Sequence, residues 1–253
     1  MQQPRHILIT GASSGIGAAL AQAYAAPGCH LALTGRQAGR LAAIATTCRA
    51  KGAIVRELVL DVCDRQQVEE QLSALDAEQP LDLVIANAGI SGGTSGGNES
   101  SEQVRAIFQT NLDGVLNTVL PLLPRMEARR QGQIALMASL AGYRGFPGAP
   151  AYCGSKAAIK VWGEGLRGQL AASGIEVTVI MPGYVKSPMT EVNDFPMPFL
   201  MPAERAAILI RDRLKRNPAR IAFPWPTAIL AWLIATLSPR LTDPVLAMLP
   251  KKS

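Results

Sequence analysis

Three residues in the second half of the chain have the types and spacing needed for proton transfer. Tyr152 and Lys156 lie four residues apart, and Ser139 precedes Tyr152 by thirteen positions. Residues 152–172 read as a long helix, and residues four apart on a helix share one face. An ammonium group beside a phenol favours the phenolate and lowers the tyrosine pKa from about 10. Such a tyrosine can exchange a proton with a substrate oxygen near neutral pH, to which Ser139 can donate a hydrogen bond.

The pair of Tyr152 and Lys156 is a weak signal when it is taken alone. A tyrosine followed four residues later by a lysine is common and usually marks a solvated helix face. Tyr24, Tyr143 and Tyr184 have no lysine at that spacing, so the pair is not a product of composition. Its meaning therefore depends on the elements that position it.

A glycine-rich turn near the start of the chain has the features of a phosphate-binding site. Residues 6–10 read as a short buried strand and residues 13–26 as a helix. Between them, glycine permits positive φ and close backbone approach, and the free N–H groups of a helix start attract negative charge. The spacing Gly11-x3-Gly15-x-Gly17 differs from the common G-x-G-x-x-G fingerprint. A tight turn before a well-packed helix is therefore an equally weighted alternative.

The end of the second expected strand indicates which dinucleotide would bind. Residues 29–34 form this strand, which runs into Gly35 and Arg36. A site for NAD usually has an acidic residue here, whereas an arginine suits the 2′-phosphate of NADP. No acidic residue follows until Glu57, while Arg36 and, as a second candidate, Arg40 are available. The sequence predicts NADP(H) over NAD(H), against the alternative of a solvated surface arginine.

Composition excludes several other classes of protein. The 253 residues carry a net charge of +6, but the basic residues are scattered and aromatic residues make up only 5%, so no nucleic-acid partner is expected. The four cysteines have no metal-ligand spacing and there are only two histidines, so no metal site is expected. Free thiols fit a reducing cytoplasm, and the N-terminus does not read as a signal peptide.

In order and spacing, these motifs resemble the single-domain branch of the short-chain dehydrogenase/reductase family. The resemblance covers residues 6 to about 190. The residues that carry it are Gly11, Gly15, Gly17, Asn87-Ala88-Gly89, Asn111, Ser139, Tyr152, Lys156 and Pro182-Gly183.

The resemblance implies a role for each matching residue. Tyr152 would be the general acid/base, Lys156 would bind the nicotinamide ribose and depress the tyrosine pKa, and Ser139 would orient the substrate carbonyl. Asn111 would hold a water molecule in a proton relay. Ser187 stands where the family usually has threonine, and it keeps the hydroxyl group. The full set expected to contact the cofactor is Gly11, Ser13, Ser14, Gly15, Ile16, Gly17, Arg36, Asp61, Val62, Asn87, Ala88, Gly89, Tyr152, Lys156, Pro182, Gly183, Val185 and Ser187.

Strands alternate with helical segments along the chain, which predicts an α/β fold with a doubly wound, Rossmann-type parallel sheet covered by helices on both faces. We expect one catalytic domain over residues 1–223, with a lid at about 186–202. Residues 224–253 would form an apolar helical C-terminal extension packed on the domain, on a dimer interface or on a membrane surface.

Two segments bear on the substrate. The lid is rich in methionine and phenylalanine, which predicts an apolar pocket, with ordinary lid packing as the equal alternative. Residues 228–237 are apolar nearly all round but too short to span a bilayer. We expect this helix to be buried on more than one side. The alternative is a helix that lies in a membrane interface or admits a lipid-like substrate.

The sequence thus predicts a cytoplasmic NADP(H)-dependent oxidoreductase that interconverts a carbonyl and an alcohol, on a small and apolar or lipid-like substrate. A homodimer through helices matching residues 103–125 and 152–172 is expected. Peripheral membrane contact through residues 224–250 is the alternative to packing of that segment on the protein. The alternatives are an isomerase or dehydratase on the same fold, and a non-enzymatic NADP-binding or membrane-associated interaction protein.

Overall fold

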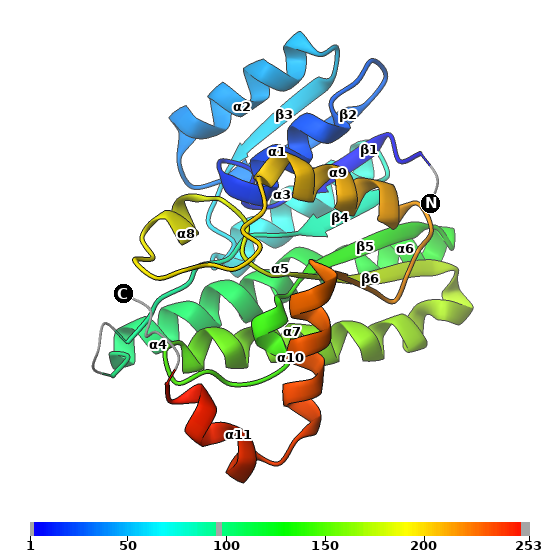
Figure 1. The fold of residues 1–253 in the computed structure, drawn as a ribbon. Helices are drawn as coiled ribbons and strands as arrows, with labels where there is room; N and C mark the ends of the chain where they lie inside the picture. The colour runs from blue at the N-terminus through cyan, green and yellow to red at the C-terminus, as the bar shows by residue number, and fades with distance from the viewer. Residues whose placement is uncertain (1–2, 95–97, 249–253) are drawn as a thin grey trace.

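A computed structural model describes residues 3–94 and 98–248. Within them, seven parallel strands form one sheet in the order β3-β2-β1-β4-β5-β6-β7 (Figure 1). The strands are β1 (His6–Ile9), β2 (His30–Gly35), β3 (Ile54–Val59), β4 (Leu83–Ala86), β5 (Gly132–Met137), β6 (Ile175–Pro182) and β7 (Arg220–Phe223). The α-helices are α1 (Gly15–Tyr24), α2 (Ala38–Ala50), α3 (Arg65–Glu78), α4 (Ser101–Phe108), α5 (Gly114–Val119), α6 (Leu123–Arg129), α7 (Pro150–Leu170), α8 (Pro188–Glu191), α9 (Ala203–Leu214), α10 (Trp225–Thr236) and α11 (Pro239–Leu246). Three shorter helical segments are η1 (Gln109–Asp113), η2 (Leu140–Gly142) and η3 (Ala171–Ser173).

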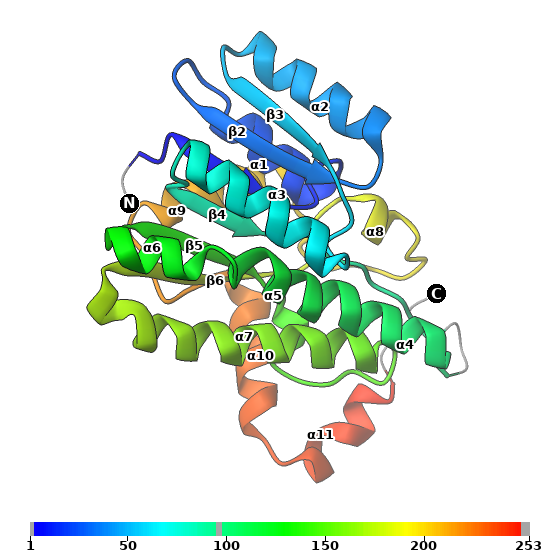
Figure 2. The same cartoon turned by 180° about the vertical axis from the view of Figure 1, so that it is seen from behind.

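Helices cover both faces of the sheet and enclose two apolar cores. In β1, Ile7 and Ile9 point into the core under α1, α2 and α9, whereas Leu8 points into the core under α3, α5, α6 and α7. Figures 1 and 2 show these two layers from opposite sides. Strands buried on both faces read as continuous apolar runs, as β1 and β4 do. The predicted doubly wound, Rossmann-type α/β fold is confirmed.

The strand order reverses between β1 and β4, which places the ligand-binding edge of the sheet. Successive strands run outward from β1 to β2 and β3, and the chain then returns to β4 on the other side of β1. Ligands of open parallel sheets bind at the carboxyl ends of the strands at such a reversal. The glycine-rich turn follows β1, and Asn87 follows β4, so both predicted motifs lie at this edge.

Two element boundaries differ from the sequence prediction. The apolar run at residues 58–60 predicts a third strand only there, whereas β3 spans Ile54–Val59 and forms an edge of the sheet. Its charged residues Arg56 and Glu57 interrupt the apolar run on which the prediction depended. The apolar run at residues 133–139 predicts a fifth strand that ends in Ser139. In the structure β5 ends at Met137, and Ser139 instead caps the short helix η2.

The expectation that the apolar C-terminal helix is buried on more than one side is wrong for the single chain. No residue of α10 is buried. Ala228 and Ala231 pack against the domain, while larger apolar side chains face outward. Among the described residues, no helix is both long enough and apolar enough to cross a bilayer. Leu249, which ends the next apolar stretch, lies outside the described residues.

Candidate active site

The glycine-rich turn brings α1 against the backbone that leaves β4. Gly11 has φ +66°, and a Cβ atom at this position would lie 2.8 Å from the Cα atom of Ala88. A Cβ atom on Gly17 would collide with the carbonyl oxygen of Gly11. Ser14 precedes the helix in an extended conformation without a side-chain cap, so the first N–H groups of α1 have no cap from this residue. The turn therefore leaves backbone donors available to an anion.

The residues after β4 lock the turn in place. The Asn87 side-chain amide donates to the carbonyl oxygen of Thr10 at 2.8 Å, and to that of Gly11 at 3.3 Å. The Thr10 hydroxyl accepts from the backbone N–H groups of Asn87 and Ala88, at 3.0 and 3.1 Å. Asn87 and Ala88 thus join the ends of the two central strands, which gives the predicted Asn87 position a structural role.

Arg36 and Asp61 meet at the outer part of this edge. An Arg36 guanidinium nitrogen lies 3.6 Å from an Asp61 carboxylate oxygen, and both side chains are largely exposed. Burial alone would raise the Asp61 pKa, but hydrogen bonds from Cys63 and the charge of Arg36 outweigh it and hold that pKa below its usual value. The ion pair was not predicted, although both residues were assigned to cofactor binding.

The backbone beside Asp61 is also fixed. Val62 is buried, and its carbonyl oxygen accepts from the Asn117 side chain at 2.9 Å. A Cβ atom on Gly114 would lie 2.6 Å from a methyl group of Val62. Asn117 and Gly114 were not recognised from the sequence, because nothing in the spacing of either residue marks its contact with a strand end.

The three residues predicted for proton transfer come together on α7 and the adjacent segment η2. A hydrogen bond joins the hydroxyl groups of Ser139 and Tyr152. The Lys156 ammonium nitrogen lies 5.9 Å from the centre of the Tyr152 ring. Ser139 also accepts from the backbone N–H of Ala141 at 3.1 Å, which orients its hydroxyl group. The chain thus presents a hydroxyl pair with a cation beside it.

Burial dominates the ionisation of this group, so the predicted lowering of the tyrosine pKa is wrong for the chain alone. Burial raises the pKa of Tyr152, and the hydrogen bond with Ser139 only partly opposes it. Burial also lowers the pKa of Lys156 to about 8. The Lys156 ammonium donates to the carbonyl oxygen of Met137 at 2.8 Å. The spacing of Tyr152 and Lys156 indicates the nearby cation, whereas the desolvation of both side chains follows only from the assembled fold.

Asn111 lies in a π-helical turn, η1, between α4 and α5. The Asn111 side chain is fully buried. Its amide nitrogen donates to the Ile90 carbonyl oxygen at 2.9 Å and to the Ser155 hydroxyl at 3.0 Å. Its amide oxygen accepts from the Ile90 N–H at 2.8 Å. π-Helical turns inside α-helices are frequent at functional sites. A Cβ atom on Gly89 would lie 3.0 Å from the side-chain oxygen Oδ1 of Asn111 and 3.3 Å from the ammonium nitrogen Nζ of Lys156. Asn111 and Lys156 thus approach the same point, and Ser155, which sequence reasoning missed, links Asn111 to α7.

The segment after β6 closes over the glycine-rich turn. The Gly183 N–H donates to Phe223 at 2.7 Å, which extends the pairing of the strand that ends at Pro182. Val185 is buried and forms a bridge with Met201. Ser187 lies against the turn, since a Cβ atom on Gly15 would be 3.1 Å from its Cβ atom.

Ser187 also caps the short helix α8, through a reciprocal hydrogen-bonded arrangement with Thr190. The expected lid over residues 186–202 is therefore tied down at both ends, by this cap and by the bridge at Met201. Phe199, which has φ +58°, and Leu200 are exposed near its end. They leave an apolar surface on the lid.

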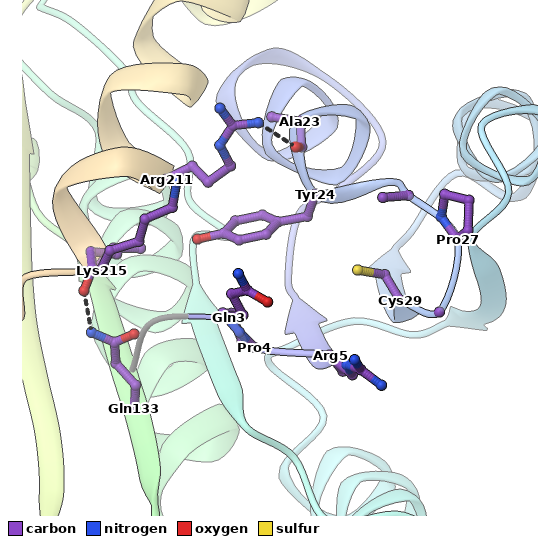
Figure 3. A pocket seen from close by; sticks show the side chains of 13 residues that line it. Gln3, Pro4, Arg5, Ala23, Tyr24, Pro27, Cys29, Gln133, Arg211 and Lys215 are labelled. Carbon is purple, nitrogen blue, oxygen red and sulfur yellow. Dashed lines mark hydrogen bonds between the residues drawn. The ribbon is translucent and has the colours of Figure 1, made fainter.

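A hollow of about 460 Å³ lies at the opposite edge of the sheet (Figure 3). It is lined by Tyr24 of α1, Gln133 of β5, and Arg211 and Lys215 from the end of α9. Arg211 and Lys215 both bond to Asp212, which offsets their charge. The hollow faces the amino ends of the strands, away from the candidate active site, and none of the predicted site residues lines it.

The four cysteines are free thiols. In the part of the chain that the structure describes, no three His, Cys, Asp or Glu side chains gather as a potential metal site.

Comparisons with known proteins agree with this arrangement. The family model for short chain dehydrogenase matches residues 5–195. An oxidoreductase of Myxococcus xanthus, described as uncharacterized, is 42% identical over 226 residues, which cover 89% of this chain and 89% of that protein. The chain therefore belongs to the short-chain dehydrogenase family, as the motifs predicted.

Solved structures share the fold at lower identity. A short-chain dehydrogenase from Sphingobium yanoikuyae in complex with NADPH has a TM-score of 0.79 at 24% identity, covering 98% of this chain and 97% of its own. A short chain dehydrogenase from Mycobacterium paratuberculosis bound to NAD has a TM-score of 0.79 at 22% identity, covering 90% of this chain and 100% of its own. The fold is thus compatible with either cofactor.

The contact between Gly17 and Gly11 predicts a steric cost. We expect Gly17→Ala to lower the free energy of unfolding by about 1–3 kcal/mol, because its Cβ atom would push the turn away from α1. The matched control is Gly39→Ala on α2, where an added Cβ atom meets nothing within 4 Å. The control should raise stability by up to about 1 kcal/mol. Urea unfolding of both variants would test the contact, and equal effects would contradict it.

The buried Lys156 predicts a pH-dependent stability difference. Its pKa falls from 10.5 in the unfolded chain to about 8, so below pH 8 the folded state holds a charged buried amine at a cost of up to about 3 kcal/mol. Removing the amine in Lys156→Met also loses its hydrogen bond to Met137, worth about 1 kcal/mol. We expect the variant to be more stable than the parent by about 2 kcal/mol at pH 7.

The sign of this effect follows from proton binding. Between pH 8 and 10.5 the unfolded state binds more protons at Lys156, so the parent gains stability relative to the variant and the difference shrinks. Lys160→Met is the control. The Lys160 ammonium is paired with the Glu164 carboxylate, whereas the Lys156 ammonium is buried without an acidic partner among the described residues. Denaturant unfolding from pH 7 to 10 would measure the difference. A variant less stable at pH 7 would contradict the prediction.

Proposed function

We propose that this protein is an NADP(H)-dependent oxidoreductase that interconverts a carbonyl and an alcohol, acting on an apolar or lipid-like small molecule. The observation that carries the proposal is the hydrogen-bonded pair of Ser139 and Tyr152, with Lys156 at 5.9 Å from the tyrosine ring. Two hydroxyl groups and a cation are the groups needed to hold a substrate oxygen and to exchange a proton with it.

The residues at the strand edge fit a dinucleotide. Gly11 and Gly17 leave no room for a Cβ atom, and the absence of side chains in this turn permits close approach of a pyrophosphate to the backbone. Ser13, Ser14, Gly15 and Ile16 belong to the same turn, and Asp61 and Val62 would border the adenine. When bound, the nicotinamide supplies or accepts the hydride. Pro182, Gly183, Val185 and Ser187 would bound its site on the other side.

The chain's own residues would handle the proton. The Tyr152 hydroxyl would give a proton to the substrate oxygen during reduction and take it back during oxidation. Ser139 would donate a hydrogen bond to the same oxygen and hold it beside the tyrosine. Lys156 would contact the ribose and bring positive charge toward the phenol. Asn111 would order the relay behind Lys156, because it is fixed by Ile90 and Ser155.

Arg36 supports NADP(H) over NAD(H). Its guanidinium lies just beyond β2, where a ribose 2′-phosphate is read, and a planar guanidinium can bind phosphate with paired hydrogen bonds. Asp61 already attracts this side chain at 3.6 Å.

We also propose a cytoplasmic homodimer through α4, η1, α5 and α7, which lie on one side of the molecule (Figure 2). Phe108, Leu120 and Val161 are exposed on or next to these helices, and apolar side chains of this kind support an interface. The four free thiols support a reducing compartment.

Tyr152→Phe removes only the hydroxyl group that would carry the proton. We expect turnover with a panel of ketones, aldehydes and alcohols to fall by at least about a hundredfold, while NADPH binding remains. Tyr24→Phe is the control, because Tyr24 lies at the opposite edge of the sheet. Absorbance of reduced nicotinamide would report turnover, and tryptophan fluorescence would report binding. A variant that keeps its activity would exclude Tyr152 from this role, and binding without turnover in the parent would favour a non-enzymatic NADP-binding protein.

Arg36→Leu tests the choice of cofactor. The loss of charge-assisted hydrogen bonds to the 2′-phosphate, worth about 1.5–3 kcal/mol, should weaken NADPH binding by about ten- to a hundredfold and leave NADH binding unchanged. Arg213→Leu is the matched control, because Arg213 is exposed in the last turn of α9, which borders the hollow at the opposite edge of the sheet. Calorimetric titration of both cofactors into each variant gives the comparison. Tighter binding of NADH than NADPH by the parent protein would overturn the assignment.

A further inference from the structure

The outward side of α10 is an apolar surface with no covering element. Six large side chains are exposed in or beside this helix, from 46% for Leu233 to 72% for Trp225. They are Trp225, Ile229, Leu230, Trp232, Leu233 and Leu237. Residues 225–236 contain no charged residue. Apolar surface gathered in this way marks a site of interaction and not an ordinary solvated helix face.

In α10 the small side chains face the domain and the large apolar side chains face outward, which is the opposite of a helix that packs on its own domain. Ala228 and Ala231 pack against the apolar core. Trp225, Ile229 and Trp232 follow the spacing of one helix face and point away from it. A helix held by packing on the domain would direct its large side chains inward. The free energy gained by removing these large apolar side chains from water can therefore still stabilise a complex with a partner.

The next helix extends this surface. Leu241 and Val245 of α11 and Met248 just after it are exposed, with Met248 at 86%. Thr242 and Leu246 of α11 are buried against the protein. Both helices project from the same end of the molecule (Figures 1 and 2). We refer to the exposed apolar residues of α10 and α11, with Leu237 and Met248, as the α10–α11 face.

Charge near the α10–α11 face is positive. In the described residues 224–248, Arg240 is the one basic residue and Asp243 the one acidic residue, and both are exposed on α11. The Asp243 carboxylate is paired with Arg144 at 2.6 Å, which leaves Arg240 without an acidic counterpart in this described stretch. Apolar side chains beside lysine and arginine are the combination that binds anionic lipids.

We propose that the α10–α11 face docks the protein on the surface of an anionic lipid bilayer. Trp225 and Trp232, seven residues apart, have the amphipathic ring that concentrates at the level of the lipid head groups. Neither helix is long enough to span the bilayer, so the contact is peripheral. The apolar side chains enter the interface, and Arg240 binds lipid phosphate.

A second copy of the chain is a poorer occupant of this surface. In a symmetric dimer the same patch faces itself, so each Arg240 would be brought against a basic patch whose one described acidic residue, Asp243, is already paired with Arg144. Like charges brought together in this way oppose association. A bilayer with anionic head groups instead complements both the apolar residues and the basic ones.

Docking would also place the bilayer near the candidate active site. Arg144, in the loop between Ser139 and Tyr152, anchors α11 through Asp243. A lipid-like substrate could then pass from the bilayer without crossing water. This consequence depends on the proposed function, whereas the docking itself does not.

Vesicle flotation tests the docking without any measurement of turnover. The full chain is mixed with vesicles of phosphatidylcholine that contain about one quarter phosphatidylglycerol, or with phosphatidylcholine alone. We expect stronger binding to the anionic vesicles, weakened by salt. The double variant Trp225→Ser/Trp232→Ser should bind the vesicles at least about tenfold less tightly, because it lacks the two aromatic side chains that the bilayer interface would bury. The matched control is Ile54→Ser/Val59→Ser, which removes two exposed apolar residues from the far edge of the sheet.

Tryptophan fluorescence gives a second readout. The chain has three tryptophans, of which Trp162 is the one outside α10. Vesicles of brominated lipid should quench the parent protein and leave the double tryptophan variant, which retains Trp162 alone, unquenched. Circular dichroism would establish that both variants are folded.

Other outcomes overturn the proposal. These are no binding to either kind of vesicle, equal binding by the parent and the double tryptophan variant, or equal loss in the control. Light scattering adds one more: a parent dimer that the tryptophan substitutions dissociate, with no vesicle binding, would assign the face to a second copy. Vesicle binding by an inactive protein would support the docking while refuting the enzyme.

Discussion

The close approach of the glycine-rich turn to the end of β4 is the constraint on which the rest of the site depends. No side chain fits between Gly11 and Ala88, or between Gly17 and the Gly11 carbonyl oxygen. The Asn87 amide, bonded to carbonyl oxygens of the turn, holds the two strand ends at that separation. The start of α1 and the residues after β4 therefore share one point of the sheet edge, and Lys156 of α7 reaches the same point at Gly89.

Desolvation and proton chemistry oppose each other in this site. A buried amine is costly while it is charged, which is why the pKa of Lys156 falls to about 8. The same burial raises the pKa of Tyr152, so the chain alone keeps the phenol protonated at neutral pH. Strained or destabilised groups of this kind are what a catalytic site retains at the expense of stability.

The sequence predicted those parts of the site that depend on local geometry. Glycine spacing after a strand, and a tyrosine and a lysine four residues apart on a helix, determine nearby backbone and side-chain directions directly. The ion pair of Arg36 with Asp61 and the hydrogen bond of Asn111 with Ser155 join distant segments, so no spacing reveals them. The direction of the Tyr152 pKa was missed for the same reason. Burial is a property of the assembled fold, and motif reading supplied only the nearby charge.

The C-terminal helix shows a different limit of sequence reasoning. The apolar composition of α10 indicates that burial of its side chains is favourable, but it does not indicate which surface will bury them. Only the fold shows that Ala228 and Ala231 occupy the side that meets the domain, so that Trp225 and Trp232 are left outside. The favourable free energy of removing these large side chains from water, on which the prediction of burial rested, is therefore not gained within the single chain. It remains as a driving force for association, and the positive charge of Arg240 beside the same apolar residues favours an anionic surface.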